Sequence, residues 1–131
     1  MMVWPLEPKM FAPYGDVVVV GEEPGYVLRI RDDRATGWIW ATSCPSSEPV
    51  QEMGFHPNSD EVFIPVHGAM VLYVAEQDRP DDIKAFHLTD PIRIRSGVWH
   101  AIVRRSEKAL LHIVENADVT GVTRKLGRVL E

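Results

Sequence analysis

Short apolar runs alternate with turns along the whole chain. Ten prolines and nine glycines punctuate it, and the runs between them are rich in valine, isoleucine and aromatic side chains. This pattern is typical of many short strands joined by turns, so we predict an all-β sandwich or barrel. The expected strands are Asp16–Val20, Tyr26–Arg31, Gly37–Thr42, Val50–Phe55, Glu61–Pro65, Ala69–Ala75, Ile83–His87, Ile92–Arg95, Val98–Arg104 and Leu110–Glu115.

Helical periodicity is limited to the two ends of the chain. Glu7–Phe11 fits a short turn of helix near the start. In the tail, Thr120 to Leu130, the apolar residues Val122, Leu126 and either Val129 or Leu130 would share one side of a helix, although two glycines weaken that pattern. We therefore expect a short N-terminal helical turn and a candidate C-terminal helix.

The predicted strand Ala69–Ala75 is apolar on both faces. Leu72 and Val74 lie on one face, and Val71 and Tyr73 on the other. A sheet in a small monomer normally exposes one face to water. The second apolar face therefore predicts packing against another sheet or another subunit, and on this ground we expect a homodimer.

Length, composition and charge fit one ordinary globular domain. The chain has 131 residues, of which 45% are hydrophobic and 25% charged, so we predict a single domain over residues 1–131. A net charge of -5 argues against a nucleic-acid partner. The single cysteine, Cys44, leaves no internal disulfide. Because no signal-like start or bilayer-length apolar run is visible, we expect a cytoplasmic protein without membrane association.

Three residues in two separate segments form the candidate centre. His56 and Glu61 flank the turn Pro57–Asp60, and Glu61 opens a strand on the same face as Phe63, so we expect its carboxylate to point inward. His100 follows the turn at Gly97. Taken singly, each is more often a satisfied core histidine or a rim charge. Taken together, they predict a shared site for a divalent metal or for acid–base chemistry.

Other polar residues are candidates for binding an anionic substrate. Arg95 precedes the turn before His100 and offers a guanidinium fork for a carboxylate, although a surface arginine is an equally good interpretation. Lys84 is a weaker candidate of the same kind. His112 alternates with Leu110 and Val114, which predicts that it faces an apolar side as His100 does.

These segments resemble the two motifs of the cupin superfamily, at about residues 54–68 and 93–104. His56, Glu61 and Gly68 follow the first motif, and Gly97 and His100 follow the second. The first histidine of the family's pair falls on Gly54, and the proline and asparagine of the second motif fall on Arg95 and Arg104. The resemblance implies a double-stranded β-helix, or jelly-roll barrel, whose metal ligands here would be His56, Glu61 and His100.

Within cupins, the chain resembles the ureidoglycolate lyase family. The matching pieces, which lie between residues 3 and 115, are Pro5-Leu6, Phe11-Ala12-Pro13-Tyr14-Gly15-Asp16-Val17, His56-Pro57, Phe63-Ile64-Pro65, Lys84-Ala85-Phe86 and Gly97-Val98-Trp99-His100. The family often has two further histidines around Val98-Trp99-His100, and a glutamine where Glu61 stands. The resemblance implies a dimeric lyase that releases urea and glyoxylate from ureidoglycolate.

Three functions therefore stay open at this point. The first is a lyase of the ureidoglycolate type, with His56 or His100 as base and Arg95 holding the substrate carboxylate. The second is another metal-dependent cupin enzyme that acts on a small carboxylic acid. The third is a non-catalytic cupin that binds such an acid.

Overall fold

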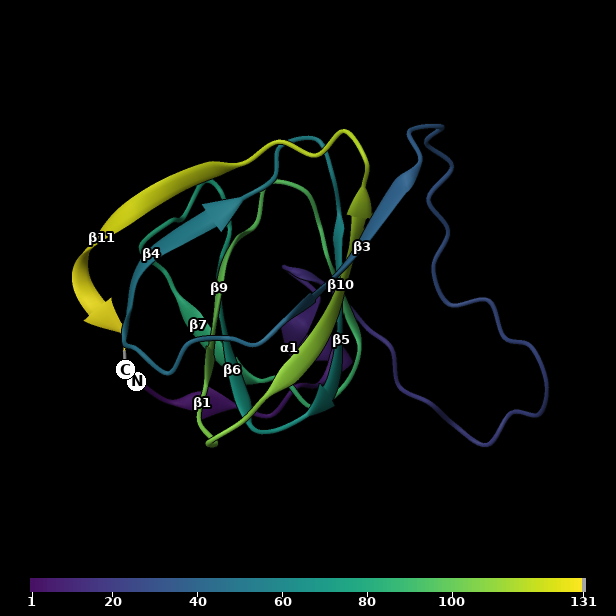
Figure 1. The fold of residues 1–131 in the computed structure, drawn as a ribbon, viewed down its shortest axis with the longest axis horizontal. Helices are drawn as coiled ribbons and strands as arrows, with labels where there is room; N and C mark the ends of the chain where they lie inside the picture. Colours follow the sequence, from purple (N-terminus) through teal and green to yellow (C-terminus); the bar gives the residue numbers. More distant parts are fainter. Residues whose placement is uncertain (131) are drawn as a thin grey trace.

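The computed structural model describes residues 1–130 as two sheets packed face to face (Figure 1). A single short helix, α1 (Pro8–Phe11), lies near the N-terminus. The six-stranded sheet has the spatial order β1 (Val3–Trp4), β7 (Lys84–His87), β6 (Met70–Ala75), β9 (Trp99–Arg104), β4 (Val50–Phe55) and β11 (Val122–Leu130). The five-stranded sheet has the order β2 (Gly15–Val17), β8 (Ile92–Ile94), β5 (Glu61–His67), β10 (Leu110–Asn116) and β3 (Trp38–Ser43).

The main apolar core lies between the two sheets. Each sheet turns alternate residues inward, so Leu72 of β6 and Leu111 of β10, both fully buried, belong to the same cluster. Phe11 closes the cluster through edge-to-face packing on Phe86, with ring centroids 5.3 Å apart. The predicted all-β jelly-roll architecture and the N-terminal helical turn are confirmed.

A second apolar cluster lies on the opposite face of β6. Val71 and Tyr73 of β6 pack there with Val50 of β4, Trp99 of β9 and Leu130 of β11. Both faces of β6 are thus covered within one chain. The feature that led us to expect a homodimer has an intramolecular explanation, and the dimer itself stays a prediction.

Two expected elements are wrong. The tail forms the strand β11 rather than a helix, because residues from Val122 to Leu130 pair antiparallel with β4 and bury Leu130 in the second cluster. The tertiary partner overrides a weak helical pattern that two glycines already interrupt. The segment Tyr26–Arg31 forms no strand, and the strand expected at Asp16–Val20 ends at Val17.

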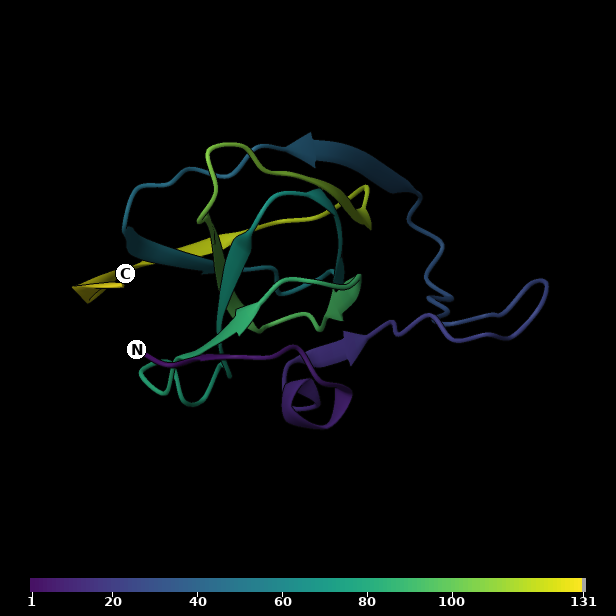
Figure 2. The same cartoon turned by 90° about the horizontal axis from the view of Figure 1, so that it is seen from below.

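Residues 18–37 form an excursion that projects from the body in both views (Figures 1 and 2). Within residues 1–130, this excursion contains no helix or strand. The end of this excursion that leads into β3 is held to the body by Arg34, whose side chain donates to Asn116 Oδ1 at 3.0 Å. No helix among the described residues is long and apolar enough to cross a membrane.

Turns tie the two motif regions together. Gly97, at a φ of 83°, adopts the left-handed conformation that favours glycine, and its N–H donates to the carbonyl of His56 at 2.8 Å. The N–H of Ser96 donates to Asp60 Oδ1 at 2.8 Å. The turn before His100 is therefore fixed directly against the turn between His56 and Glu61.

Candidate metal centre

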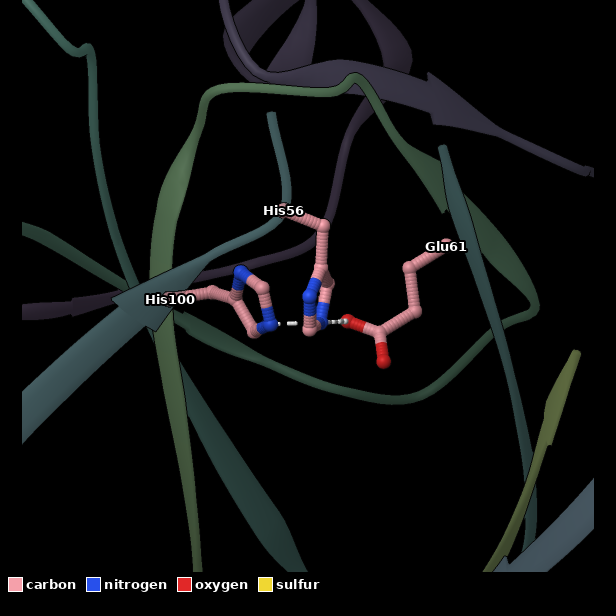
Figure 3. A group of neighbouring side chains, drawn as sticks. All are labelled: His56, Glu61 and His100. Carbon is pink, nitrogen blue, oxygen red and sulfur yellow. Dashed lines mark ion pairs between the residues drawn. The ribbon is translucent and has the colours of Figure 1, made fainter. Parts of the chain in front are cut away.

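The three predicted residues meet inside the barrel, from three different strands or strand ends (Figure 3). His56 directly follows β4, Glu61 opens β5 and His100 lies in β9. One ligand atom from each residue lies within 4.8 Å of the others. Because β4 and β9 belong to one sheet and β5 to the other, the jelly-roll packing creates this group.

Glu61 stands at the centre of the group. Its Oε1 lies 2.7 Å from Nε2 of His100 and 3.5 Å from Nε2 of His56. The two imidazole rings flank it, with centroids 5.4 Å apart. Both histidines thus present the same ring nitrogen to the same carboxylate oxygen.

The opposite ring nitrogens are held by backbone carbonyls. Nδ1 of His56 lies 2.9 Å from the carbonyl oxygen of Thr120, and Nδ1 of His100 lies 2.9 Å from that of Val98. A carbonyl oxygen only accepts, so each Nδ1 carries the hydrogen. In the neutral imidazoles the Nε2 lone pairs therefore point into the centre, which is the arrangement that orients histidine ligands toward metals.

Burial makes this arrangement costly unless a positive charge is present. The Glu61 side chain is only 6% exposed, and its Oε1 is buried without a hydrogen-bond donor among the described residues. A carboxylate oxygen facing two lone pairs is repelled by both, and a buried carboxylate without a partner is unfavourable. A bound cation or an extra proton on an imidazole resolves the conflict, and the three ligand atoms fit a divalent metal.

Glu115 is a fourth member that the sequence patterns did not identify. It lies on β10 directly across from Glu61 on β5, so the two side chains share the inner face. Its Oε1 is 4.0 Å from Nε2 of His56, and the side chain is 12% exposed. The alternation of Leu111, Ile113 and Glu115 along one face is the signal that could have placed it inward.

The electrostatics of the group follow from this crowding. A protonated His56 would donate a hydrogen bond from Nε2 to the Glu61 carboxylate, and this raises the pKa of His56 to about 9, against the lowering effect of burial. Burial acts to raise the pKa of Glu61, but the hydrogen bonds that protonated His100 and His56 would donate outweigh it and hold that pKa well below its usual range. Burial, together with the hydrogen bond to Glu61, raises the pKa of Glu115 to about 8.

The predicted substrate-binding residues lie elsewhere. Arg95 is exposed and donates to the carbonyl of Ala12, and Lys84 pairs with Asp82 at 3.2 Å on the surface. His112 accepts a hydrogen bond from Trp40 at 2.9 Å, on the outer face of the five-stranded sheet. The expectation that His112 faces the same side as His100 is wrong, because both faces of β10 carry apolar residues and Leu111 takes the core side.

Comparison with known proteins supports the fold. No family model matches the chain, and no curated protein matches it. Among solved structures, procruciferin, an 11S globulin from Brassica napus, aligns with a TM-score of 0.54 and 13% identity over 66% of this chain and 23% of that chain. This likeness confirms the cupin-type jelly-roll fold.

Two other structures align less closely. A dTDP sugar isomerase from Desulfovibrio desulfuricans G20 has a TM-score of 0.49 and 10% identity over 87% of this chain and 85% of that chain. The recombinant pro-11S globulin of pumpkin has a TM-score of 0.43 and 16% identity over 82% of this chain and 33% of that chain. This chain thus spans about a quarter of procruciferin and a third of the pumpkin protein.

Proposed function

We propose that this chain is a metal-dependent cupin enzyme acting on a small hydroxy acid, with ureidoglycolate as the first substrate to test. The observation that carries the proposal is the buried Glu61 Oε1 between the Nε2 atoms of His56 and His100. A two-histidine, one-carboxylate set leaves coordination positions open for a substrate. The resemblance of the motif regions to ureidoglycolate lyases supports the choice of substrate.

In this proposal His56, Glu61 and His100 hold the ion. A bound divalent ion would supply Lewis-acid stabilisation of the substrate alkoxide and a counter-charge for its carboxylate. The counter-charge matters here because Arg95 and Lys84, the residues predicted to bind the substrate carboxylate, make their polar contacts at the surface. The carbonyls of Thr120 and Val98 keep both imidazoles in the ligating tautomer.

Glu115 is the group that moves the proton. If both Nε2 lone pairs held a divalent ion, the imidazoles would not be available as bases, whereas the Glu115 carboxyl stands beside them. Cleavage of ureidoglycolate moves one proton from the hydroxyl oxygen to the leaving nitrogen, while the C–N bond breaks and a C=O bond forms. The Glu115 carboxylate, 4.0 Å from Nε2 of His56, would accept the hydroxyl proton and then return it to the leaving nitrogen.

Metal binding by the purified chain tests the centre. We expect calorimetry on metal-free protein to show one divalent ion per chain, and thermal unfolding to show stabilisation of about 2.7 kcal/mol when free metal is a hundredfold above its Kd. His100→Ala should weaken binding more than about tenfold. His87→Ala is the matched control, because His87 is an exposed histidine on β7. Equal metal affinity in His100→Ala and wild type would contradict the proposed metal centre.

Turnover tests the reaction separately. Metal-loaded protein incubated with ureidoglycolate should release urea and glyoxylate in equal amounts, and Glu115→Gln should slow this about a hundredfold or more while still binding metal. Metal binding with no turnover of ureidoglycolate, but tight binding of glyoxylate, would instead support a small-acid-binding protein. Full activity in Glu115→Gln would remove Glu115 from the mechanism.

A further inference from the structure

The two histidines of the candidate metal centre are held in different ways. Nδ1 of His100 faces the carbonyl of Val98, two residues earlier, where β9 is about to begin. Nδ1 of His56 faces the carbonyl of Thr120, 64 residues further along the chain. Thr120 lies in the loop 117–121 between β10 and β11. The orientation of His100 therefore depends on its own strand, whereas that of His56 depends on how this loop is fixed.

The side chain of Asn58 fixes the loop at Thr120. Its Oδ1 accepts hydrogen bonds from the backbone N–H of Thr120 at 2.9 Å and from the Thr120 hydroxyl at 3.1 Å. Its Nδ2 donates to the carbonyl of Asp118 at 2.9 Å. A backbone N–H only donates and a carbonyl only accepts, so these partners decide which end of the amide faces Thr120. Both donors of Thr120 thus bind Asn58, while its carbonyl faces His56.

The turn that carries Asn58 is itself bonded to other segments. The carbonyl of Asn58 accepts a hydrogen bond from the guanidinium of Arg34. The hydroxyl of the next residue, Ser59, is fully buried and accepts from the backbone N–H of Asn116 at 3.0 Å. A loop without such bonds opens locally more easily than the strands around it. The turn therefore offers a fixed support from which the side chain of Asn58 can hold the loop 117–121.

We propose that Asn58 is a positioning residue for the metal centre, because it fixes the Thr120 carbonyl and, through it, the ring of His56. This inference rests on the metal centre proposed above. An imidazole whose Nδ1–H is bound to a carbonyl directs the lone pair of Nε2 toward an ion. If the Thr120 carbonyl moved, His56 would lose the bond that selects this tautomer and orients the ring. Asn58 is not one of the three ligand residues, so it acts through Thr120.

The loop also contacts the ring of His56 at the residue after Thr120. A Cβ atom placed on Gly121 would lie 3.6 Å from Nδ1 of His56 and 3.8 Å from its Cε1, so the backbone of Gly121 packs against this edge of the imidazole. The ring is thus held by a hydrogen bond and by a packing contact from the same short segment. This packing contact can be measured in metal-free protein, which separates the position of the ring from the presence of an ion.

Calorimetry of zinc binding to the metal-free full chain is the first measurement. Asn58→Ala should weaken zinc binding about tenfold, the lower end of the range for residues that support a metal-bound histidine. Asn116→Ala is the matched control, because the side chain of Asn116 also makes two hydrogen bonds, to Arg34 and Asp32 in the excursion. It should change the zinc affinity by less than about threefold. Thermal unfolding of both metal-free variants shows whether the fold is equally intact.

Proton NMR of the metal-free chain is the second measurement. Wild type and Asn116→Ala should show a nuclear Overhauser effect between Hε1 of His56 and the Hα atoms of Gly121, and Asn58→Ala should lose it. If wild type bound no zinc while this contact still depended on Asn58, the metal centre would be contradicted and the hold of Asn58 on His56 supported.

Three results would overturn the role of Asn58. The first is an Asn58→Ala variant that keeps the contact between His56 and Gly121, whatever its zinc affinity. The second is loss of this contact without loss of zinc affinity, because the position of the ring would then not matter to the ion. The third is an equal loss of zinc affinity in Asn58→Ala and Asn116→Ala, which would indicate a general effect on the fold.

Discussion

The outer faces of the two sheets differ in how far the rest of the chain covers them. Beyond the shared core, the six-stranded sheet packs Tyr73 of β6 under β4 and β11, where it is fully buried. The five-stranded sheet presents Trp38 of β3 to the outside at 68% exposure. Both strands are apolar on both faces in sequence, so hydrophobicity alone does not decide which face is covered.

The difference follows from what the chain places beside each strand. β6 is central, with β7 and β9 as neighbours, and the C-terminal strand adds Leu130 to its outer face. β3 lies at an edge, and the segment before it projects away rather than folding over it. An apolar outer face that the chain covers contributes to stability, whereas one left open is available for association.

The test of this contrast with the largest expected effect on stability is alanine substitution of Tyr73 and Trp38. Tyr73→Ala should lower the free energy of unfolding by about 3–5 kcal/mol, because it leaves a large cavity under β11. Trp38→Ala should change it by less than about 0.5 kcal/mol when unfolding is measured in urea below the concentration at which the chain associates. Equal losses in the two variants would mean that β3 is covered within the monomer.

A second pair of substitutions tests the tail. Leu130 is 2% exposed and Val129 is 50% exposed, as expected for neighbours on opposite faces of a strand. Leu130→Ala should lower the free energy of unfolding by about 2 kcal/mol, and Val129→Ala by less than about 0.5 kcal/mol. The urea midpoints of the two variants give this comparison directly. If alanine substitutions of Leu126 and Val129 both lowered the free energy of unfolding strongly, that pattern would indicate a helix and contradict the strand.

Local patterns predicted most of the fold. The punctuated runs predicted β2 to β10 but not β1 or β11, because alternation and turn residues act over a few positions. The tail and the segment Tyr26–Arg31 were not predictable in this way. The first becomes a strand only because β4 offers it an edge, and the second has strand-forming residues but no partner within the described chain.

The candidate centre shows the same limit. His56, Glu61 and His100 were predicted because each stands next to a turn that the sequence marks clearly. Glu115 was missed because the alternation of Leu111, Ile113 and Glu115 indicates only an inward side chain, whereas its place opposite Glu61 depends on the strand register. His112 was misplaced because β10 is apolar on both sides, so alternation could not distinguish the core face from the outer face.

The test with the smallest expected effect removes a single hydrogen bond from each outer face and keeps an aromatic side chain. Tyr73→Phe deletes the hydroxyl that accepts a hydrogen bond from Arg105 at 2.9 Å, and Trp40→Phe deletes the N–H that donates to His112 at the same distance. The buried hydroxyl should contribute about 1 kcal/mol to the free energy of unfolding, and the exposed indole N–H less than about 0.5 kcal/mol, because water replaces its partner. Urea unfolding at low protein concentration separates these values. If Trp40→Phe proved the more costly of the two, the Trp40–His112 contact would have to stabilise the monomer, and the outer face of β3 could not be regarded as an open surface.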